Sequence, residues 1–106
     1  MGMDINKLMQ QAQQMQEQLA QAQEEAATQV VEASAGGGMV TVKATGAGEL
    51  TEVKIKPEAI DPDDPEVLED MVLAAVNEAL RSASGLMESK MSGLMGGLGG
   101  LGLPGM

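Results

Sequence analysis

The sequence predicts an α+β fold in which a helix, a three-stranded antiparallel sheet and a second helix follow one another along the chain. Three observations predict it: a helical apolar spacing from Asp4 to about Thr28, three glycine-separated strand-like runs between residues 29 and 57, and a second helical spacing after Asp64. The 106 residues suffice for one domain. We therefore expect one α+β domain over residues 1–91 and a flexible Gly/Leu/Met-rich tail over residues 92–106.

The first predicted helix runs from Asp4, its expected N-cap, to about Thr28. Its apolar residues are spaced alternately by three and four, which is the spacing of a coiled-coil seam. The seam consists of Ile5, Leu8, Ala12, Met15, Leu19, Ala22 and Ala26. It either packs against a partner helix or only covers the sheet of its own chain.

Three short runs between the helices have strand character. The first is Gln29–Ser34, and the glycines 36–38 after it permit a turn with positive φ. In Val40–Thr45, apolar and polar residues alternate, as expected for a strand with one buried face. The third run, Thr51–Lys56, alternates in the same way, and Pro57 ends it because proline cannot donate to a sheet.

The second predicted helix begins with Asp64 as N-cap and Pro65 as its first residue. Gly85 either ends this helix or interrupts it before another turn or two. The tail that starts at Ser92 is uncharged, and its many glycines make regular structure costly, so we expect it to lack order in isolation. The tail either hangs free or docks into a groove or onto a neighbouring protomer.

The composition also predicts the assembly. No aromatic residue is present, so the core has to be built from smaller aliphatic side chains and methionine. Folding costs about 1 to 2 kcal/mol of backbone entropy for each ordered residue. The burial of such small side chains within one protomer offsets too little of this cost. We therefore expect a two-fold homodimer.

The residue types present leave little for catalysis. The chain has no His, Cys, Tyr or Trp, and its Ser and Thr hydroxyls show no triad pattern, so we expect no enzyme, no small-molecule substrate, no cofactor and no metal. The start "MGMD" lacks a signal-peptide core, and no apolar run is long enough to span a bilayer. A cytoplasmic protein without a membrane partner is the expectation.

Charge is distributed unevenly along the chain. The formal net charge is −10, yet the stretch from Met39 to Lys56 has three lysines against two glutamates and is therefore net positive. The strand alternation places Lys43, Lys54 and Lys56 on one outward face. These lysines either keep an exposed sheet face soluble or form a local patch where phosphates are tolerated.

Four stretches in the same order carry a resemblance to a known family: "LMQQAQQMQEQL" from Leu8, "GGGMVTV" from Gly36, "GELTEVKI" from Gly48 and "LEDMVLAAVNEAL" from Leu68. In these stretches the chain resembles the YbaB/EbfC family of bacterial nucleoid-associated proteins over roughly residues 4 to 90. The resemblance implies a homodimer of the predicted fold that binds DNA, alters its conformation and helps to organise the nucleoid. Because no recognition-helix layout is visible, we expect it to bind double-stranded DNA with low sequence specificity, with effects on gene expression.

The candidate DNA-binding residues come from both arguments. Charge patterning supplies the three sheet lysines, and the resemblance implies basic positions at Lys54 and Arg81; Lys7 on the first helix completes the set. The alternative is a homodimeric protein-interaction module that binds a protein partner through the first helix and the apolar tail.

Overall fold

The computed structural model describes residues 4–99, which form an elongated molecule with extents of 79 × 28 × 15 Å. Helix α1 spans Ile5–Thr28. Asp4 caps it as predicted, because its Oδ1 accepts hydrogen bonds from the backbone N–H groups of Asn6 at 3.1 Å and Lys7 at 3.4 Å. The cap satisfies two amides that the helix itself leaves unpaired.

The three strands are β1 (Val30–Ala35), β2 (Val40–Thr45) and β3 (Leu50–Ile55). They form an antiparallel sheet in the order β1-β2-β3, as predicted. The strand alternation of β2 is complete, because every second side chain from Val40 to Ala44 is buried. Between β2 and β3 the register shifts after Lys43, so that Leu50 rather than Thr51 lies opposite Ala44. The shift is a β-bulge, which strand alternation alone does not reveal.

Helix α2 spans Pro65–Gly99 and begins directly after Asp64, as predicted. Gly85 neither ends nor interrupts it, and the helix continues through the first eight residues of the segment 92–106, which was expected to be flexible. Residues 92–99 are thus helical where the sequence predicted no regular structure, while residues 100–106 lie outside the described residues. The packing of α2 beside α1 accounts for the difference, since such contacts offset the low helix propensity of glycine.

The core lies between the sheet and the first half of α2. Small residues dominate it: Val40, Val42, Ala33 and Ala44 of the sheet lie under Ala75, Ala79 and Ala83 of α2. Because the stripe on α2 consists of alanines, the helix approaches the sheet closely. Val40 and Val42 are the largest fully buried side chains among the described residues, so the core of one chain is small.

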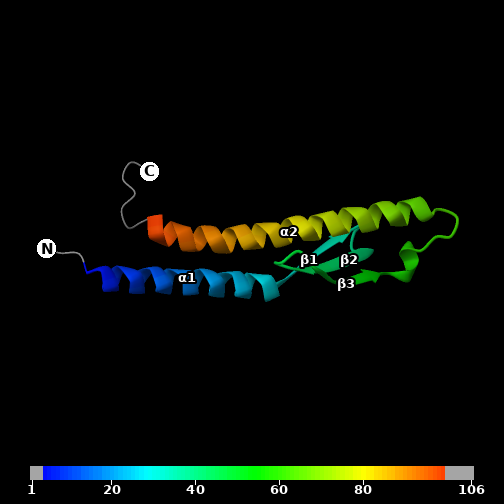
Figure 1. Cartoon of the computed structure of the whole chain (residues 1–106). Helices are drawn as coiled ribbons and strands as arrows, with labels where there is room; N and C mark the ends of the chain where they lie inside the picture. Colours follow the sequence, from blue (N-terminus) through cyan, green and yellow to red (C-terminus); the bar gives the residue numbers. More distant parts are fainter. Residues whose placement is uncertain (1–3, 100–106) are drawn as a thin grey trace.

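Helix α2 covers β1 and β2 but leaves the inner face of β3 largely open. Val53 of β3 is 45% exposed and Ile55 is 37% exposed. Beyond the sheet, the second half of α2 runs antiparallel beside α1 and forms a helical arm (Figure 1). The molecule therefore has a sheet end and an arm end, and the two-fold homodimer stays a prediction.

Candidate nucleic-acid interface

Lys43 lies at the centre of the outer sheet face, between two glutamates. In the register of the sheet it is opposite Glu32 of β1 and Glu52 of β3. Its Nζ is 3.7 Å from Glu52 Oε2, and both side chains are about two-fifths exposed (40% and 39%). An ion pair at this exposure is weak and screened by salt, but it keeps Lys43 from presenting a full positive charge to solvent.

Lys54 is the second-last residue of β3, and Lys56 follows directly after the strand. Lys54 is opposite Thr41 in the register, so a hydroxyl rather than a carboxylate is its nearest cross-strand neighbour. Both lysines are exposed, and within residues 4–99 no ion pair holds either ammonium group. They are therefore the two cations of this face that are free to meet a phosphate.

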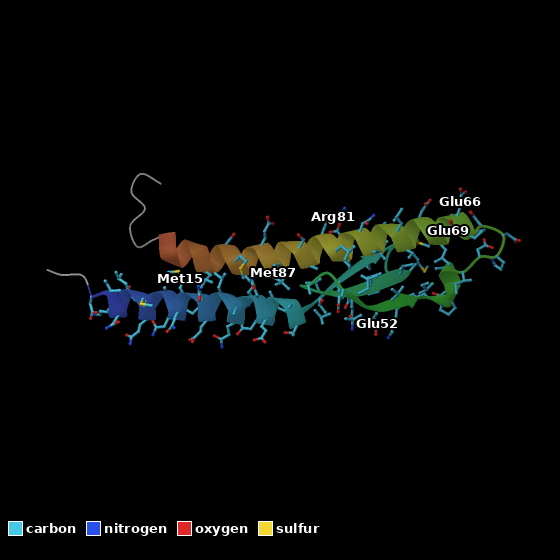
Figure 2. All side chains as sticks on the ribbon, in the orientation of Figure 1. Met15, Glu52, Glu66, Glu69, Arg81 and Met87 are labelled. Atoms are coloured by element: carbon cyan, nitrogen blue, oxygen red, sulfur yellow. The ribbon has the colours of Figure 1, made fainter. Side chains whose placement is uncertain are left out.

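The structure does not bring the five predicted residues together. Arg81 lies on α2, where its guanidinium is bound to Glu78 Oε2 through Nε at 3.3 Å and Nη2 at 2.8 Å. It projects from the side of the molecule opposite to that of Glu52 (Figure 2). Lys7 is in the first turn of α1, about 30 Å along the helix axis from the sheet end of that helix. The five predicted residues thus lie in three separate parts of the molecule. Of these three parts, only the sheet face has more than one of the predicted lysines.

The end of the molecule that lies farthest from the helical arm is rich in carboxylates. From Pro57 to Leu80, which covers the 3-10 turn η1 (Pro57–Ala59) and the first half of α2, the chain has eight acidic residues and no Lys or Arg. Glu66 projects outward there (Figure 2). DNA approaching the sheet is therefore repelled from this end, and the Debye length of about 8 Å limits the repulsion to close range.

The opposite face of the sheet carries an apolar groove instead of charge. It has a volume of about 460 Å³ and lies between β3 and α2, lined by Ile55, Leu68, Glu69, Val72, Leu73 and Val76. Leu73 is 60% exposed and Leu80, two turns further along, is 36% exposed. We call this surface the β3–α2 face. A contiguous open apolar surface of this kind marks an interaction site.

Sequence reasoning missed two parts of this arrangement. Glu32 was not recognised as a neighbour of Lys43, because the pairing of β1 with β2 fixes which residues are opposite one another. Leu73 was not recognised either, although with Val76 and Leu80 it forms a helical stripe at intervals of three and four. That stripe was the available signal for the β3–α2 face.

No group of three or more His, Cys, Asp or Glu side chains in the described part of the chain is arranged to hold a metal ion. None of the helices within residues 4–99 combines the length and hydropathy needed to cross a membrane. What the geometry does offer is a pair of surfaces on the two sides of one sheet, one bearing lysines and one apolar. The fold and these surfaces define a small α+β protein of the binding class.

The comparison with known families is direct: the model of the YbaB/EbfC DNA-binding family matches residues 1–98, and the chain belongs to this family. A nucleoid-associated protein of Acetivibrio thermocellus is 54% identical over 100 residues, which cover 94% of this chain and 88% of that protein. A nucleoid-associated protein of Saccharopolyspora erythraea is 50% identical, with 97% and 94% covered. The predicted resemblance is thus confirmed, and the family is one of bacterial nucleoid-associated DNA-binding proteins.

A solved structure supports the fold. The crystal structure of an uncharacterized protein, HP0035, from Helicobacter pylori aligns with a TM-score of 0.72 over 89% of this chain and 99% of that chain. At 22% sequence identity the likeness concerns the fold alone.

Proposed function

We propose that this chain forms a two-fold homodimer that binds duplex DNA with low sequence specificity, alters its conformation and acts in the nucleoid of the cytoplasm, with effects on gene expression. Family membership supports DNA as the partner. The observation that carries the proposed surface is the outer sheet face, where Lys54 and Lys56 are exposed and free of ion pairs within residues 4–99.

Low sequence specificity follows from the kind of contact this face can make. Lysine ammonium groups are point charges that bind phosphate oxygens, which position a protein on DNA but do not identify bases. No aromatic residue is available in the chain to stack on bases. The sheet face therefore reads backbone charge and shape rather than base edges.

The β3–α2 face supports the homodimer. A second copy is a suitable occupant because its own β3–α2 face is also apolar, and a two-fold contact pairs the same surface on both chains. Strand alternation puts Val53 and Ile55 on the side of β3 opposite to Lys54, so dimerisation through the apolar side leaves the lysines of both chains accessible.

The dimer surface is tested by Leu73→Glu, with Ala74→Glu as its control. Both variants add one negative charge to α2; Leu73 lies in the β3–α2 face, whereas Ala74 is exposed on the outer side of the helix. We expect Leu73→Glu to convert the dimer to monomer in sedimentation velocity at micromolar concentration, and Ala74→Glu to stay dimeric. A dimer that persists in Leu73→Glu would assign the interface elsewhere.

The DNA surface is tested by an electrophoretic shift series on duplex DNA at 50 mM salt. Lys54→Ala combined with Lys56→Ala should weaken binding at least tenfold, because the dimer then loses four phosphate contacts. Arg81→Ala is the comparison, since it removes one positive charge per chain from the other side of the molecule. Equal losses in the two proteins would rule out the sheet as the principal contact.

A second candidate function is a homodimeric protein-interaction module. The observation that favours it is the exposed apolar side of α1, where Ile5 is 69% and Met9 is 60% exposed. Deletion of residues 92–106 distinguishes the two functions. A protein-interaction module that uses the tail loses its protein partner on deletion, whereas duplex binding through the sheet stays unchanged.

A further inference from the structure

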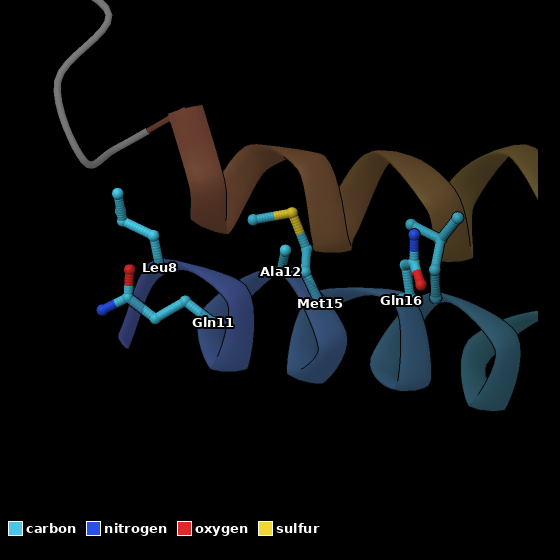
Figure 3. Close-up of a pocket in the computed structure, with 6 residues that line it drawn as sticks. Leu8, Gln11, Ala12, Met15 and Gln16 are labelled. Carbon is cyan, nitrogen blue, oxygen red and sulfur yellow. The ribbon is translucent and has the colours of Figure 1, made fainter. Parts of the chain in front are cut away.

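A second apolar groove runs along α1 beside the end of α2. It has a volume of about 390 Å³, and among the residues whose side chains the structure describes it is lined by Leu8, Gln11, Ala12, Met15, Gln16 and Leu19. Figure 3 shows Met15 pointing toward the last turns of α2, while Leu8 lies beyond the end of that helix. Leu8 is 49% exposed and Met15 is 41% exposed. These two exposures show that part of the α1 seam is open to solvent at this end of the arm.

The two helices of the arm end at different points. Within residues 4–99, α1 extends past the last turn of α2 (Figure 1). The first turns of α1 therefore have an apolar side with no described helix beside them.

We propose that this groove binds the C-terminal segment of the same chain, residues 100–106. The segment starts from Gly99, the residue at which α2 ends beside the groove. Seven residues reach up to about 25 Å when extended, whereas Leu8 and Leu19 are about 16 Å apart along α1. The segment can therefore cover the whole groove with no change in α2.

The chemistry of the segment fits the groove. It reads "GLGLPGM", carries no side-chain charge, and offers Leu101, Leu103 and Met106 as apolar anchors. Pro104 has no N–H and does not continue a helix, so an extended course is favoured there. Gln11 and Gln16 lie at the groove, and their amides can bond to the backbone of an extended segment.

Docking of the segment has a consequence for the partners of α1. Once Leu8 and Met15 are covered, the seam is closed to a helix from another molecule. The C-terminal segment is then an internal competitor of any apolar partner of the arm, and this role is independent of DNA binding at the sheet.

The absence of natural cysteine makes disulfide trapping in the full chain a clean test. One variant carries Leu8→Cys with Leu103→Cys; the control carries Gln10→Cys with Leu103→Cys. Residue 10 is only two positions away but faces the other side of α1, since two residues rotate a helix by about 200°. Under mild oxidation we expect the Leu8 pair to form an intrachain disulfide roughly tenfold faster than the Gln10 pair, because docking raises its effective concentration.

Two outcomes would overturn the proposal. Equal rates for the two pairs would show that the segment does not prefer the groove. Disulfide-linked dimers of the Leu8 pair on a non-reducing gel would make a second copy the occupant. Amide hydrogen exchange provides a measurement without cysteines: changing Leu101 and Leu103 to Ser in the full chain should speed exchange several-fold in residues 5–15 and leave the strands unaffected. Unchanged exchange in residues 5–15 would also contradict docking.

Discussion

At the scale of single residues, the charge on the outer sheet face is set by cross-strand neighbours as much as by the lysines themselves. Lys43 lies between Glu32 and Glu52, and the latter holds it at 3.7 Å. Lys54 is opposite Thr41 instead. Two lysines of one face thus differ in what they can offer a phosphate, and the glutamates oppose the DNA binding that we propose for this face.

Removing that restraint should strengthen binding. Glu52→Gln keeps the shape of the side chain, frees Lys43 and removes one repulsive charge. At low salt we expect duplex affinity to rise roughly two- to fivefold, the ratio that about 0.4 to 1 kcal/mol produces. Glu24→Gln on the exposed surface of α1 is the matched control in a fluorescence anisotropy titration. If both variants gain equally, net charge alone is responsible and the Lys43 pair has no special role.

Position 46 has room only for glycine. Gly46 is buried where β2 ends, and its N–H donates to Gln29 O at 3.0 Å. A Cβ there would overlap the carbonyl group of Ala26 at the end of α1. Only glycine therefore allows α1 to join the sheet at this point.

Two glycine-to-alanine changes should thus have opposite effects on the free energy of unfolding. Gly46→Ala pushes the end of β2 away from the Ala26 carbonyl group and should lower the free energy of unfolding by about 1 to 3 kcal/mol. Gly85→Ala meets no atom within 4 Å in an exposed helix position and should stabilise by about 0.5 to 1 kcal/mol. Urea denaturation at fixed protein concentration measures both. A neutral Gly46→Ala would refute the close contact between α1 and β2.

At the scale of the elements, the alanine stripe of α2 determines how closely helix and sheet approach. Ala75, Ala79 and Ala83 are at most 1% exposed against the sheet. A larger side chain in this stripe has no free space, because protein interiors are close-packed. The approach distance, and with it the position of the β3–α2 face, depends on these three residues.

Ala79→Leu should therefore destabilise the fold by about 1 to 3 kcal/mol, although leucine is a good helix former. Ala74→Leu, on the exposed outer side of the same helix, should change the free energy of unfolding by less than about 0.5 kcal/mol. Thermal unfolding followed by circular dichroism measures both variants. Equal stability of the two proteins would show that the helix is not closely packed on the sheet.

The sequence predicted the elements whose signals are local. Strand β2 showed its alternation because one face is fully buried, and Asp64 with Pro65 marked the start of α2. The bulge after Lys43 was not predictable, because it depends on how two strands pair. The helix beyond Gly85 was missed for a similar reason, since its contacts with α1 outweigh glycine propensity. Strand alternation predicted that Lys43 and Lys54 share one sheet face, but not that Glu32 and Glu52 lie opposite Lys43. The role of these lysines in DNA binding stays a prediction.

At the scale of the whole molecule, the two sides of one sheet have separate tasks in the proposed dimer. The β3–α2 face joins the protomers, and the outer faces present lysines from both chains to DNA. The net charge of −10 per chain opposes this binding at a distance. Binding is therefore expected only at short range, and it should depend steeply on salt.

The salt dependence of duplex affinity tests the central claim most directly. For the natural protein and for Lys54→Ala combined with Lys56→Ala, the dissociation constant is measured by fluorescence anisotropy from 50 to 200 mM salt. Four lost phosphate contacts per dimer should reduce the slope of log affinity against log salt by about 3 to 4. An unchanged slope, or no binding by the natural protein even at 50 mM salt, would contradict DNA recognition through the outer sheet face.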